Sequence, residues 1–282
     1  MAVVVAMRGR LGNNLFQYAV GRIIAEQHGF ALACHTRPLG RTEYLLNIPS
    51  ARLTELSAYF PGAPLSLPGM VSTAPIACYD IDHRPGWDGQ VFPLAAELQD
   101  CRPRLIQLGG FFQRYEYFAP FRARLREWFT PRYHGALTRV DPRDIVVNIR
   151  RGNDFLKLGW ILPLSYYRSI LSSVASVGRI HICGTGVDAQ VRLFFREYSP
   201  VYHAGPPLAD FCLMRGCRRI ILSNSTFAWW AAYLSDATHI FGPSAPLGNG
   251  FAFSGFDGVS LEMERARYQS VAVTCFEKAE LA

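Results

Sequence analysis

The stretch Asp144-Ile145-Val146-Val147-Asn148-Ile149-Arg150-Arg151-Gly152-Asn153-Asp154-Phe155, just past the midpoint of the chain, decides the fold that the sequence predicts. Its apolar residues up to Ile149 are typical of a fully buried strand. The polar turn that follows places two guanidinium groups and a carboxylate at the carboxyl edge of the predicted sheet. Ligands bind at that edge in open α/β folds. The stretch therefore predicts a buried parallel sheet and a binding site at its edge.

Arg150 and Arg151 suit an anionic diphosphate, because a guanidinium forks onto phosphate oxygens and keeps its charge at any ordinary pH. The alternative interpretation is structural: one of the two arginines pairs with Asp154 on a solvated loop. Two arginines after a strand are not rare, so this stretch alone does not decide between the two interpretations.

The rest of the second half alternates between strand and helix patterns, as a series of βαβ units does. Helices are predicted over residues 164–177, 188–198 and 207–216, and strands over residues 179–183, 201–203 and 219–222. The alternation predicts a Rossmann-like sheet in this half of the chain.

The segment Ser223-Asn224-Ser225-Thr226-Phe227 leads into an aromatic helix. Its hydroxyl and amide residues are a strong helix N-cap signal, and they also suit a phosphate, because hydroxyls join the free N–H groups of the first helical turn. Capping alone needs only one of them. The adjacent Trp229 and Trp230 are not expected to face the core together. One of them is expected against a neighbouring domain or a ligand, with simple helix packing as the alternative.

The first half opens with a predicted strand, Val3 to Met7, a glycine-punctuated turn and a helix. Asn14 is the predicted N-cap of this helix, with Gln17 completing a capping box, and Gly29 is the predicted stop. A glycine turn between strand and helix suits an anion or a polar ligand. The alternative is that the glycines only permit a tight turn.

Residues 34–99 are rich in Pro and Gly, and they predict short strands and long loops. They include Asp80-Ile81-Asp82-His83, a DxD pattern that suits Mg²⁺ or Mn²⁺, although surface carboxylates beside a small strand are the more common explanation. A strand over residues 105–108 and a helix with Leu125 on its apolar side follow. Residues 131–142 are predicted to connect two domains, which are predicted over 1–139 and 140–282.

Charge and composition limit the classes of partner. The net charge is +7, from 29 basic and 22 acidic residues, which favours anionic partners. No basic block occurs, so we expect no nucleic acid as partner. Seven scattered cysteines favour reduced thiols in the cytoplasm. The sequence has no apolar span of transmembrane length. We therefore expect a cytoplasmic protein, with peripheral contact to the anionic cytosolic face of a membrane compatible with its charge.

Four segments together resemble the bacterial α-1,2-fucosyltransferases of glycosyltransferase family 11. The residues that carry the resemblance are Arg10-Leu11-Gly12-Asn13-Asn14-Leu15-Phe16-Gln17-Tyr18-Ala19, Gly110-Phe111-Phe112-Gln113 with Tyr117-Phe118, Asn148-Ile149-Arg150-Arg151-Gly152, and Ser223-Asn224-Ser225-Thr226-Phe227-Ala228-Trp229-Trp230. They occur in the family's order between residues 10 and 234.

The resemblance implies a metal-independent, inverting transferase of GT-B-like architecture, an α/β fold with two Rossmann-like domains that face a central cleft. It implies that the amino-terminal domain binds the acceptor, with Gln113 and Arg114 on the acceptor side. It implies that the carboxyl-terminal domain binds the donor GDP-fucose and that the enzyme needs no cofactor. Arg150 would be the leading β-phosphate ligand. The other donor-binding residues that it implies are Asn13, Asn148, Arg151, Asp210, Ser223, Asn224, Ser225, Thr226 and Phe227.

Asp210 matches the position where related fucosyltransferases place an acid against guanine. One carboxylate can accept both N1–H and the exocyclic amine of guanine. The alternative is a charge that stabilises the first turn of a helix.

The chain departs from the family pattern at two positions. Asn148 stands where the motif has His, and an inserted residue gives Gly152-Asn153-Asp154 in place of Gly-Asp. The carboxylate of Asp154 is a candidate general base, and a residue of the amino-terminal domain is the alternative.

The resulting hypothesis is transfer of L-fucose from GDP-β-L-fucose to the 2-hydroxyl of a galactose-terminated oligosaccharide or lipid-linked glycan. A binding module that has lost catalysis and a transferase for another GDP-sugar are the alternatives.

Overall fold

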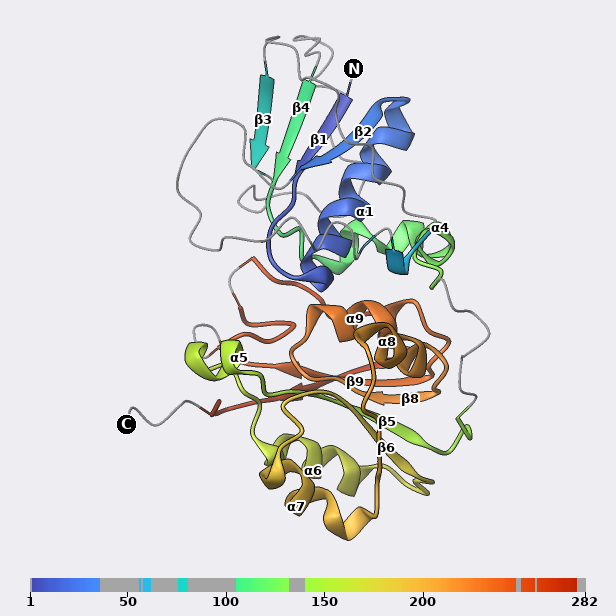
Figure 1. Ribbon diagram of the computed structural model, residues 1–282, viewed down its shortest axis with the longest axis vertical. Helices are drawn as coiled ribbons and strands as arrows, with labels where there is room; N and C mark the ends of the chain where they lie inside the picture. The colour runs from blue at the N-terminus through green and yellow to red at the C-terminus, as the bar shows by residue number, and fades with distance from the viewer. Residues whose placement is uncertain are drawn as a thin grey trace. The chain divides into compact units, whose positions relative to one another are not determined.

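The computed structural model describes residues 2–35, 56, 58–61, 76–80, 105–131, 140–246, 250–256 and 258–277. The chain divides into two compact units, Met1–Arg132 and Tyr133–Ala282. Each unit contains a parallel sheet (Figure 1), so the predicted α/β class is confirmed. The division falls within the predicted connection 131–142. The assignment of acceptor and donor to the two domains, and the cleft between them, stay predictions.

Unit 1 holds a four-stranded sheet in the order β2-β1-β4-β3, in which every pairing is parallel. Its strands are β1 (Ala2–Ala6), β2 (Ala31–His35), β3 (Ile76–Asp80) and β4 (Leu105–Gly109). Its longer helices are α1 (Leu11–His28) and α4 (Arg122–Trp128), and two single 3-10 turns, Tyr115–Tyr117 and Ala119–Phe121, precede α4.

Helix α1 begins earlier than predicted. Its N-cap is Arg10, and Asn14 lies buried in the first turns, so the predicted capping box at Asn14 and Gln17 is wrong. Asn14 instead donates to the carbonyl of Arg8 and to Gln17 Oε1, and Gln17 donates to the carbonyl of Gly110 after β4. The predicted stop is confirmed, because Gly29 adopts a left-handed conformation with φ of 66° that caps the helix.

Unit 2 holds a six-stranded parallel sheet in the order β10-β9-β8-β5-β6-β7. The chain starts at the central strand β5, runs outward through β6 and β7, and then crosses to β8, β9 and β10. This doubly wound order has its topological switch point between β5 and β8. The strands are β5 (Ile145–Arg150), β6 (Ile180–Thr185), β7 (Val201–Tyr202), β8 (Arg219–Ile221), β9 (His239–Ser244) and β10 (Tyr268–Ala272).

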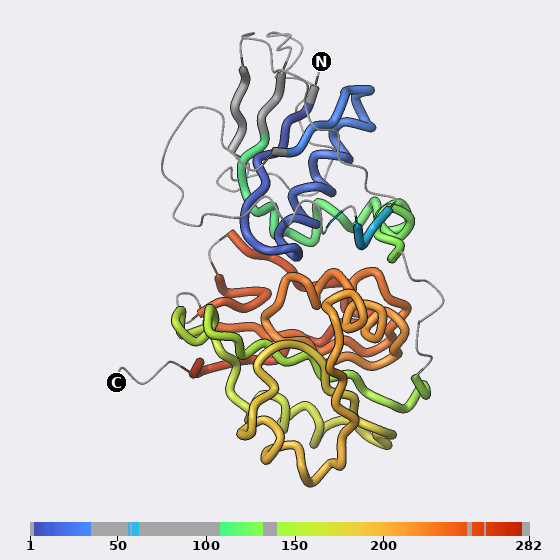
Figure 2. Tube along the Cα trace, viewed as in Figure 1, coloured from blue at the N-terminus to red at the C-terminus, as the bar shows by residue number. Residues whose placement is uncertain are grey.

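Helices cover both faces of this sheet, with α6 and α7 on one side and α8 and α9 on the other (Figure 1; Figure 2 gives the same view as a tube). Their bounds are α5 (Asn153–Leu158), α6 (Leu164–Ser173), α7 (Ala189–Phe195), α8 (Pro207–Arg215) and α9 (Thr226–Tyr233). The alternate β5 residues Ile145, Val147 and Ile149 pack in one core with Tyr167 of α6 and Phe195 of α7. These residues are 1% exposed or less.

Apart from α5, the helices and strands of unit 2 match the sequence prediction to within a few residues until residue 234. Helix α6 ends at Ser173 instead of 177, and α7 continues as a 3-10 turn over Arg196–Tyr198. Asp188 caps α7 by accepting from the N–H of Val191 at 2.9 Å. The sequence interpretation missed α5, β9 and β10, which lie beyond clear βα periodicity.

Both tryptophans of α9 are buried. Trp229 and Trp230 are each 0% exposed, and Trp229 Nε1 donates to the carbonyl of Leu261 at 2.7 Å. The expectation that only one would face a core is therefore wrong. Residues 228–234 are all fully buried, so this helix is apolar all round rather than amphipathic.

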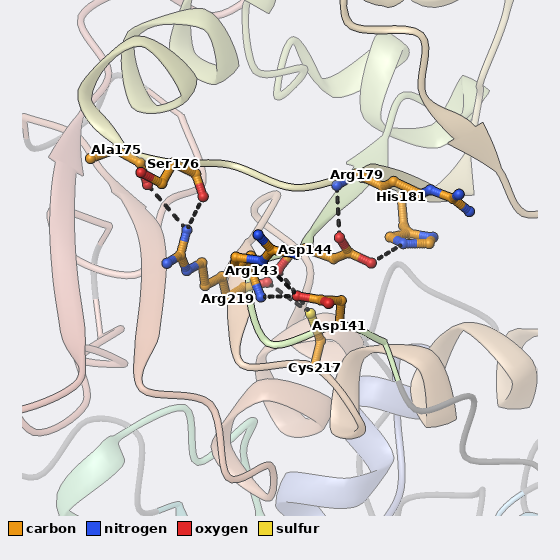
Figure 3. Close-up of polar contacts among 9 residues, drawn as sticks. All are labelled: Asp141, Arg143, Asp144, Ala175, Ser176, Arg179, His181, Cys217 and Arg219. Carbon is orange, nitrogen blue, oxygen red and sulfur yellow. Dashed lines mark hydrogen bonds and ion pairs between the residues drawn. The ribbon is translucent and has the colours of Figure 1, made fainter.

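A polar cluster joins β5 and β6 at their amino-terminal ends, opposite the predicted site (Figure 3). Asp144 accepts from the N–H of Arg179 at 2.7 Å and contacts His181 Nε2 at 3.1 Å. His181 Nδ1 lies 3.0 Å from His203 Nε2, just beyond β7. The cluster therefore links the starts of β5 and β6 to His203, which follows β7.

Candidate functional site

The candidate site lies where β5 and β8 end, at the switch point of the unit 2 sheet. The register pairs Val147 with Ile221, so Arg150 and the segment Ser223–Phe227 both emerge at the carboxyl edge. β6 ends at the same edge, with Thr185 opposite Arg150. The sheet topology therefore gathers residues that are far apart in the sequence.

Arg150 is held in a defined position at this edge. Its Nη1 donates to Thr185 Oγ1 at 2.8 Å, its Nη2 pairs with Asp154, and its guanidinium lies 4.6 Å from the ring centroid of Phe155. The Arg150 side chain is 11% exposed and that of Asp154 is 30% exposed. The structure thus contains the Arg150–Asp154 pair of the alternative interpretation, at a ligand-binding edge rather than on an isolated loop.

Arg151 reaches a different set of partners. Its Nη2 contacts Gln190 Oε1 and Glu277 Oε2, each at 2.8 Å, and its side chain is only 7% exposed. The contacts described for Arg150 run instead to Thr185, Asp154 and Phe155. The two guanidinium groups are thus held by different sets of partners. A supporting role of Arg151 at a diphosphate stays a prediction.

Asn148 and Ser223 lock the ends of β5 and β8 together. The Ser223 hydroxyl donates to Asn148 Oδ1, and the two side chains are buried. Asn148 also bonds to Cys183, whose thiol pKa is raised mainly by burial. The amide of Asn148, which stands where the resembled motif has His, therefore has a structural role at the sheet edge.

The two halves of the Ser223–Phe227 segment have different surroundings. Asn224 is fully buried, and its Nδ2 donates to the carbonyls of Trp160 at 2.6 Å and Phe251 at 2.9 Å. Ser225 is the N-cap of α9 and accepts from the N–H of Ala228 at 3.4 Å. Ser225, Thr226 and Phe227 are partly exposed. The half of the segment at the helix start is therefore the half that a ligand can reach.

Asp210 lies in the first turn of α8, beside the end of β6. Burial raises the pKa of Asp210 to about 7, and an N–H donated by Gly184 acts against this rise. Gly184 has φ of 118°, and a Cβ there would lie 2.0 Å from the Ile149 carbonyl oxygen. The site therefore contains a carboxyl group that changes charge near neutral pH and a backbone turn that only glycine permits.

The two unit 1 motifs meet at the carboxyl ends of the neighbouring strands β1 and β4. Gln113 Nε2 donates to Asn13 Oδ1 at 3.0 Å. Gln17 is fully buried, accepts from the N–H of Arg8 at 3.0 Å, and donates to the Gly110 carbonyl at 3.0 Å. The glycine turn is therefore fastened to the β4 loop by side-chain amides.

Arg114 pairs loosely with Glu116 at 3.9 Å and lies 6.0 Å from the Tyr117 ring. Asn13, Gln113 and Arg114 thus gather in unit 1, whereas Asn148, Arg150, Asp154, Asp210 and Ser223–Phe227 gather in unit 2.

Of the DxD pattern, Asp80 ends β3, and residues 81–83 lie outside the described residues. Within the described part of the chain, no group of three or more His, Cys, Asp or Glu side chains could hold a metal ion. No helix in the same part is long and apolar enough to cross a membrane.

Sequence reasoning missed Thr185, Phe155 and Trp160 at this edge. Thr185 ends a strand that was predicted, so its proximity to Arg150 could have been inferred from parallel pairing. Phe155 lies in α5 and Trp160 just after it, and this short helix has no periodic pattern that predicts it. The fold and this edge together define an α/β protein with a doubly wound sheet and polar side chains at its switch point, the place where sheets of this kind bind ligands.

Comparison of sequences relates the chain to fucosyltransferases. Residues 194–242, which include Asp210 and Ser223–Phe227, match the model of glycosyl transferase family 11. Galactoside alpha-(1,2)-fucosyltransferase 1 of Homo sapiens is 24% identical over 270 residues, covering 83% of this chain and 65% of that protein. The protein of the same name from Saimiri sciureus gives the same values. The chain therefore spans just under two thirds of the length of these relatives.

Solved structures of fucosyltransferases and a heptosyltransferase are also similar to the chain. Fucosyltransferase NodZ from Bradyrhizobium has a TM-score of 0.46 and 16% identity, covering 84% of this chain and 94% of that chain. Escherichia coli heptosyltransferase WaaC with ADP has a TM-score of 0.44 and 11% identity, covering 97% of this chain and 93% of that chain.

Proposed function

We propose that this chain is a family 11 glycosyltransferase that moves L-fucose from GDP-β-L-fucose to the 2-hydroxyl of a galactoside, with inversion. The observation that carries the proposal is that Arg150 and the partly exposed start of α9 both lie at the switch point of a doubly wound sheet, where β5 and β8 end. The similarity of residues 194–242 to family 11 and of the longer alignment to galactoside α-1,2-fucosyltransferases supports the choice of donor and linkage.

In this proposal the diphosphate binds between Arg150 and the N-terminus of α9. The guanidinium supplies charge-assisted donors, and the first turn of α9 adds N–H groups with the hydroxyls of Ser225 and Thr226. Asp210, in its charged form, accepts N1–H and the amine of guanine. Arg151 supports the edge indirectly, through its contacts with Gln190 and Glu277.

The acceptor's 2-hydroxyl attacks C1 of fucose while the bond from C1 to the β-phosphate oxygen breaks. Negative charge grows on the departing GDP, so donors that are already in place lower the barrier most. Arg150 is such a donor, because Thr185, Asp154 and the ring of Phe155 fix its guanidinium. The proton of the attacking hydroxyl goes to a general base.

Asp154 is our candidate for that base. Its carboxylate pairs with Arg150, and a diphosphate on the same guanidinium competes with it. Donor binding would then release a carboxylate beside the reacting bond. A residue of unit 1 is the alternative base. In unit 1 we propose Asn13 at the donor and Gln113 and Arg114 on the acceptor side. The acceptor is a galactose-terminated oligosaccharide or lipid-linked glycan, and the net charge of +7 suits contact with an anionic membrane surface on the cytoplasmic side.

The test is incubation with GDP-fucose and lactose, with GDP release and the mass of the product as readouts. We expect a fucosylated lactose from the unmodified protein, a loss of at least about 50-fold in rate for Arg150→Ala, and near-normal rate for Arg143→Ala. Arg143 is an exposed arginine paired with Asp141 at the opposite sheet edge, so it is a matched control.

Two outcomes separate the proposal from its alternatives. GDP-fucose binding without product would favour a binding module that has lost catalysis, which Asn148 and the inserted residue before Asp154 suggest. Product from another GDP-sugar at a higher rate would identify a different donor. Equal transfer by Arg150→Ala and the unmodified protein would remove the assigned role of Arg150.

A further inference from the structure

Four aromatic rings gather beside Arg150 at the carboxyl edge of the unit 2 sheet. The Phe155 ring lies under the guanidinium and is 5.8 Å from the Trp160 ring. Trp160 lies 5.6 Å from both Phe251 and Phe256, which are 5.3 Å from each other. The rings come from α5, from the loop after it, and from the loop after β9.

Packing within a core does not account for the whole cluster. Phe251 is buried, but Phe155, Trp160 and Phe256 remain partly exposed. Fully buried Asn224 fixes the backbone of the cluster by donating to the carbonyls of Trp160 and Phe251, which are far apart in the sequence. A rigid, partly solvated aromatic surface next to a cation is what a ligand with both an anionic and an apolar part requires.

We propose that Phe155, Trp160 and Phe256 form an aromatic wall that binds the 6-deoxy sugar of the donor through its methyl group and adjacent C–H face. The inference rests on the proposed function, because Arg150 is taken to hold the β-phosphate. The sugar is joined directly to that phosphate. With the guanidinium 4.6 Å from Phe155, a sugar attached to a phosphate on Arg150 comes within reach of the wall.

The wall gives a specific expectation for donor selectivity. GDP-L-galactose differs from GDP-L-fucose only by a hydroxyl on C6, and that hydroxyl would lose hydration against aromatic rings. A hydrophobic pocket rejects such an added hydroxyl by no more than about 100-fold. We therefore expect a preference for GDP-L-fucose on the order of 10- to 100-fold in kcat/KM.

The first experiment measures the affinity of GDP and of GDP-fucose for Trp160→Leu, Phe256→Leu and the unmodified protein, by calorimetry. The wall predicts that the variants keep their GDP affinity within about twofold and lose most of the extra affinity that fucose adds, on the order of 10-fold. Phe194→Leu is the matched control, since it removes a partly buried ring on α7 that packs under Arg168. It should leave both affinities unchanged.

The second experiment compares GDP-L-fucose with GDP-L-galactose as donors to lactose. We expect the selectivity ratio to fall at least about 5-fold in the two wall variants and to stay constant in Phe194→Leu. Unchanged ratios, or equal losses of GDP and GDP-fucose affinity, would overturn the wall and assign the rings to folding alone. Neither result would contradict the proposed function. That function is contradicted instead if the unmodified protein does not transfer fucose at all.

Discussion

At the scale of single residues, the surroundings of Asp210 shift the pKa of the carboxyl group that we propose to bind guanine. Burial raises the pKa of its carboxyl group to about 7, although the N–H of Gly184 favours the charged form. A carboxylate accepts both guanine donors, whereas a protonated carboxyl group has one of its oxygens occupied by a proton. Guanine recognition by Asp210 should therefore depend on pH near neutrality.

We predict that GDP affinity falls as the pH decreases from 8 to 6, because Asp210 takes up a proton below about 7. The decrease approaches about tenfold per pH unit once most of the carboxyl group is protonated. Asp210→Asn should bind GDP more weakly at pH 8 and lack this dependence. Titrations of both proteins across this range check the prediction. A parallel pH dependence in the two proteins would exclude Asp210 as the group responsible.

At the scale of elements, the start of α9 combines a structural and a binding role. Ser225→Ala removes the N-cap, which should cost about 1 kcal/mol of stability, and removes a hydroxyl from the proposed phosphate site. Asp188→Ala removes the equivalent cap of α7, so it should cost a similar amount of stability. Only Ser225→Ala should weaken GDP binding, by about 3- to 10-fold. Equal GDP affinity in the two variants would limit Ser225 to capping.

His203, which contacts His181 in the polar cluster at the opposite edge of the sheet, should make stability sensitive to acid. Burial and the neighbouring His181 lower the pKa of His203 below its usual 6.5. The folded state therefore binds this proton more weakly than the unfolded chain, and stability should decrease as the pH falls below about 6.5. Urea unfolding at pH 7.5 and 5.5 should show this decrease, and His203→Gln should reduce it. An unaltered pH dependence in His203→Gln would place the acid sensitivity elsewhere.

The elements also show what the sequence could predict. Apart from α5, the βα alternation predicted the elements from β5 to α9 to within a few residues, because apolar periodicity is a local signal. The start of α1 was wrong because Asn14, a good capping residue, bonds instead to Arg8 and Gln17. The different orientations of Arg150 and Arg151 depend on contacts with Thr185 and Glu277, which are distant in sequence and invisible to local patterns.

At the scale of the whole molecule, each unit has a parallel sheet. In each unit, the segments that resemble family 11 lie at the carboxyl ends of the strands. In unit 1, Gln113 and Asn13 bond to each other; in unit 2, Arg150 and the start of α9 share the switch point. For unit 2 the sequence predicted a site at this edge, because ligand sites of open α/β sheets follow topology. It did not predict the bond between Gln113 and Asn13. It did not predict the aromatic wall, since Phe251 and Phe256 lie beyond the last predicted helix and carry no periodic pattern.

The most direct test of the central claim is the affinity of GDP for the unmodified protein, Arg150→Ala and Arg143→Ala, measured by calorimetry at pH 8. Losing charge-assisted bonds to the diphosphate should cost about 2–4 kcal/mol, or about 30- to 1000-fold in affinity. Arg143→Ala should stay within about twofold of the unmodified protein. A folded Arg150→Ala protein that binds GDP as tightly as the unmodified one would contradict the assignment of the diphosphate site to this sheet edge.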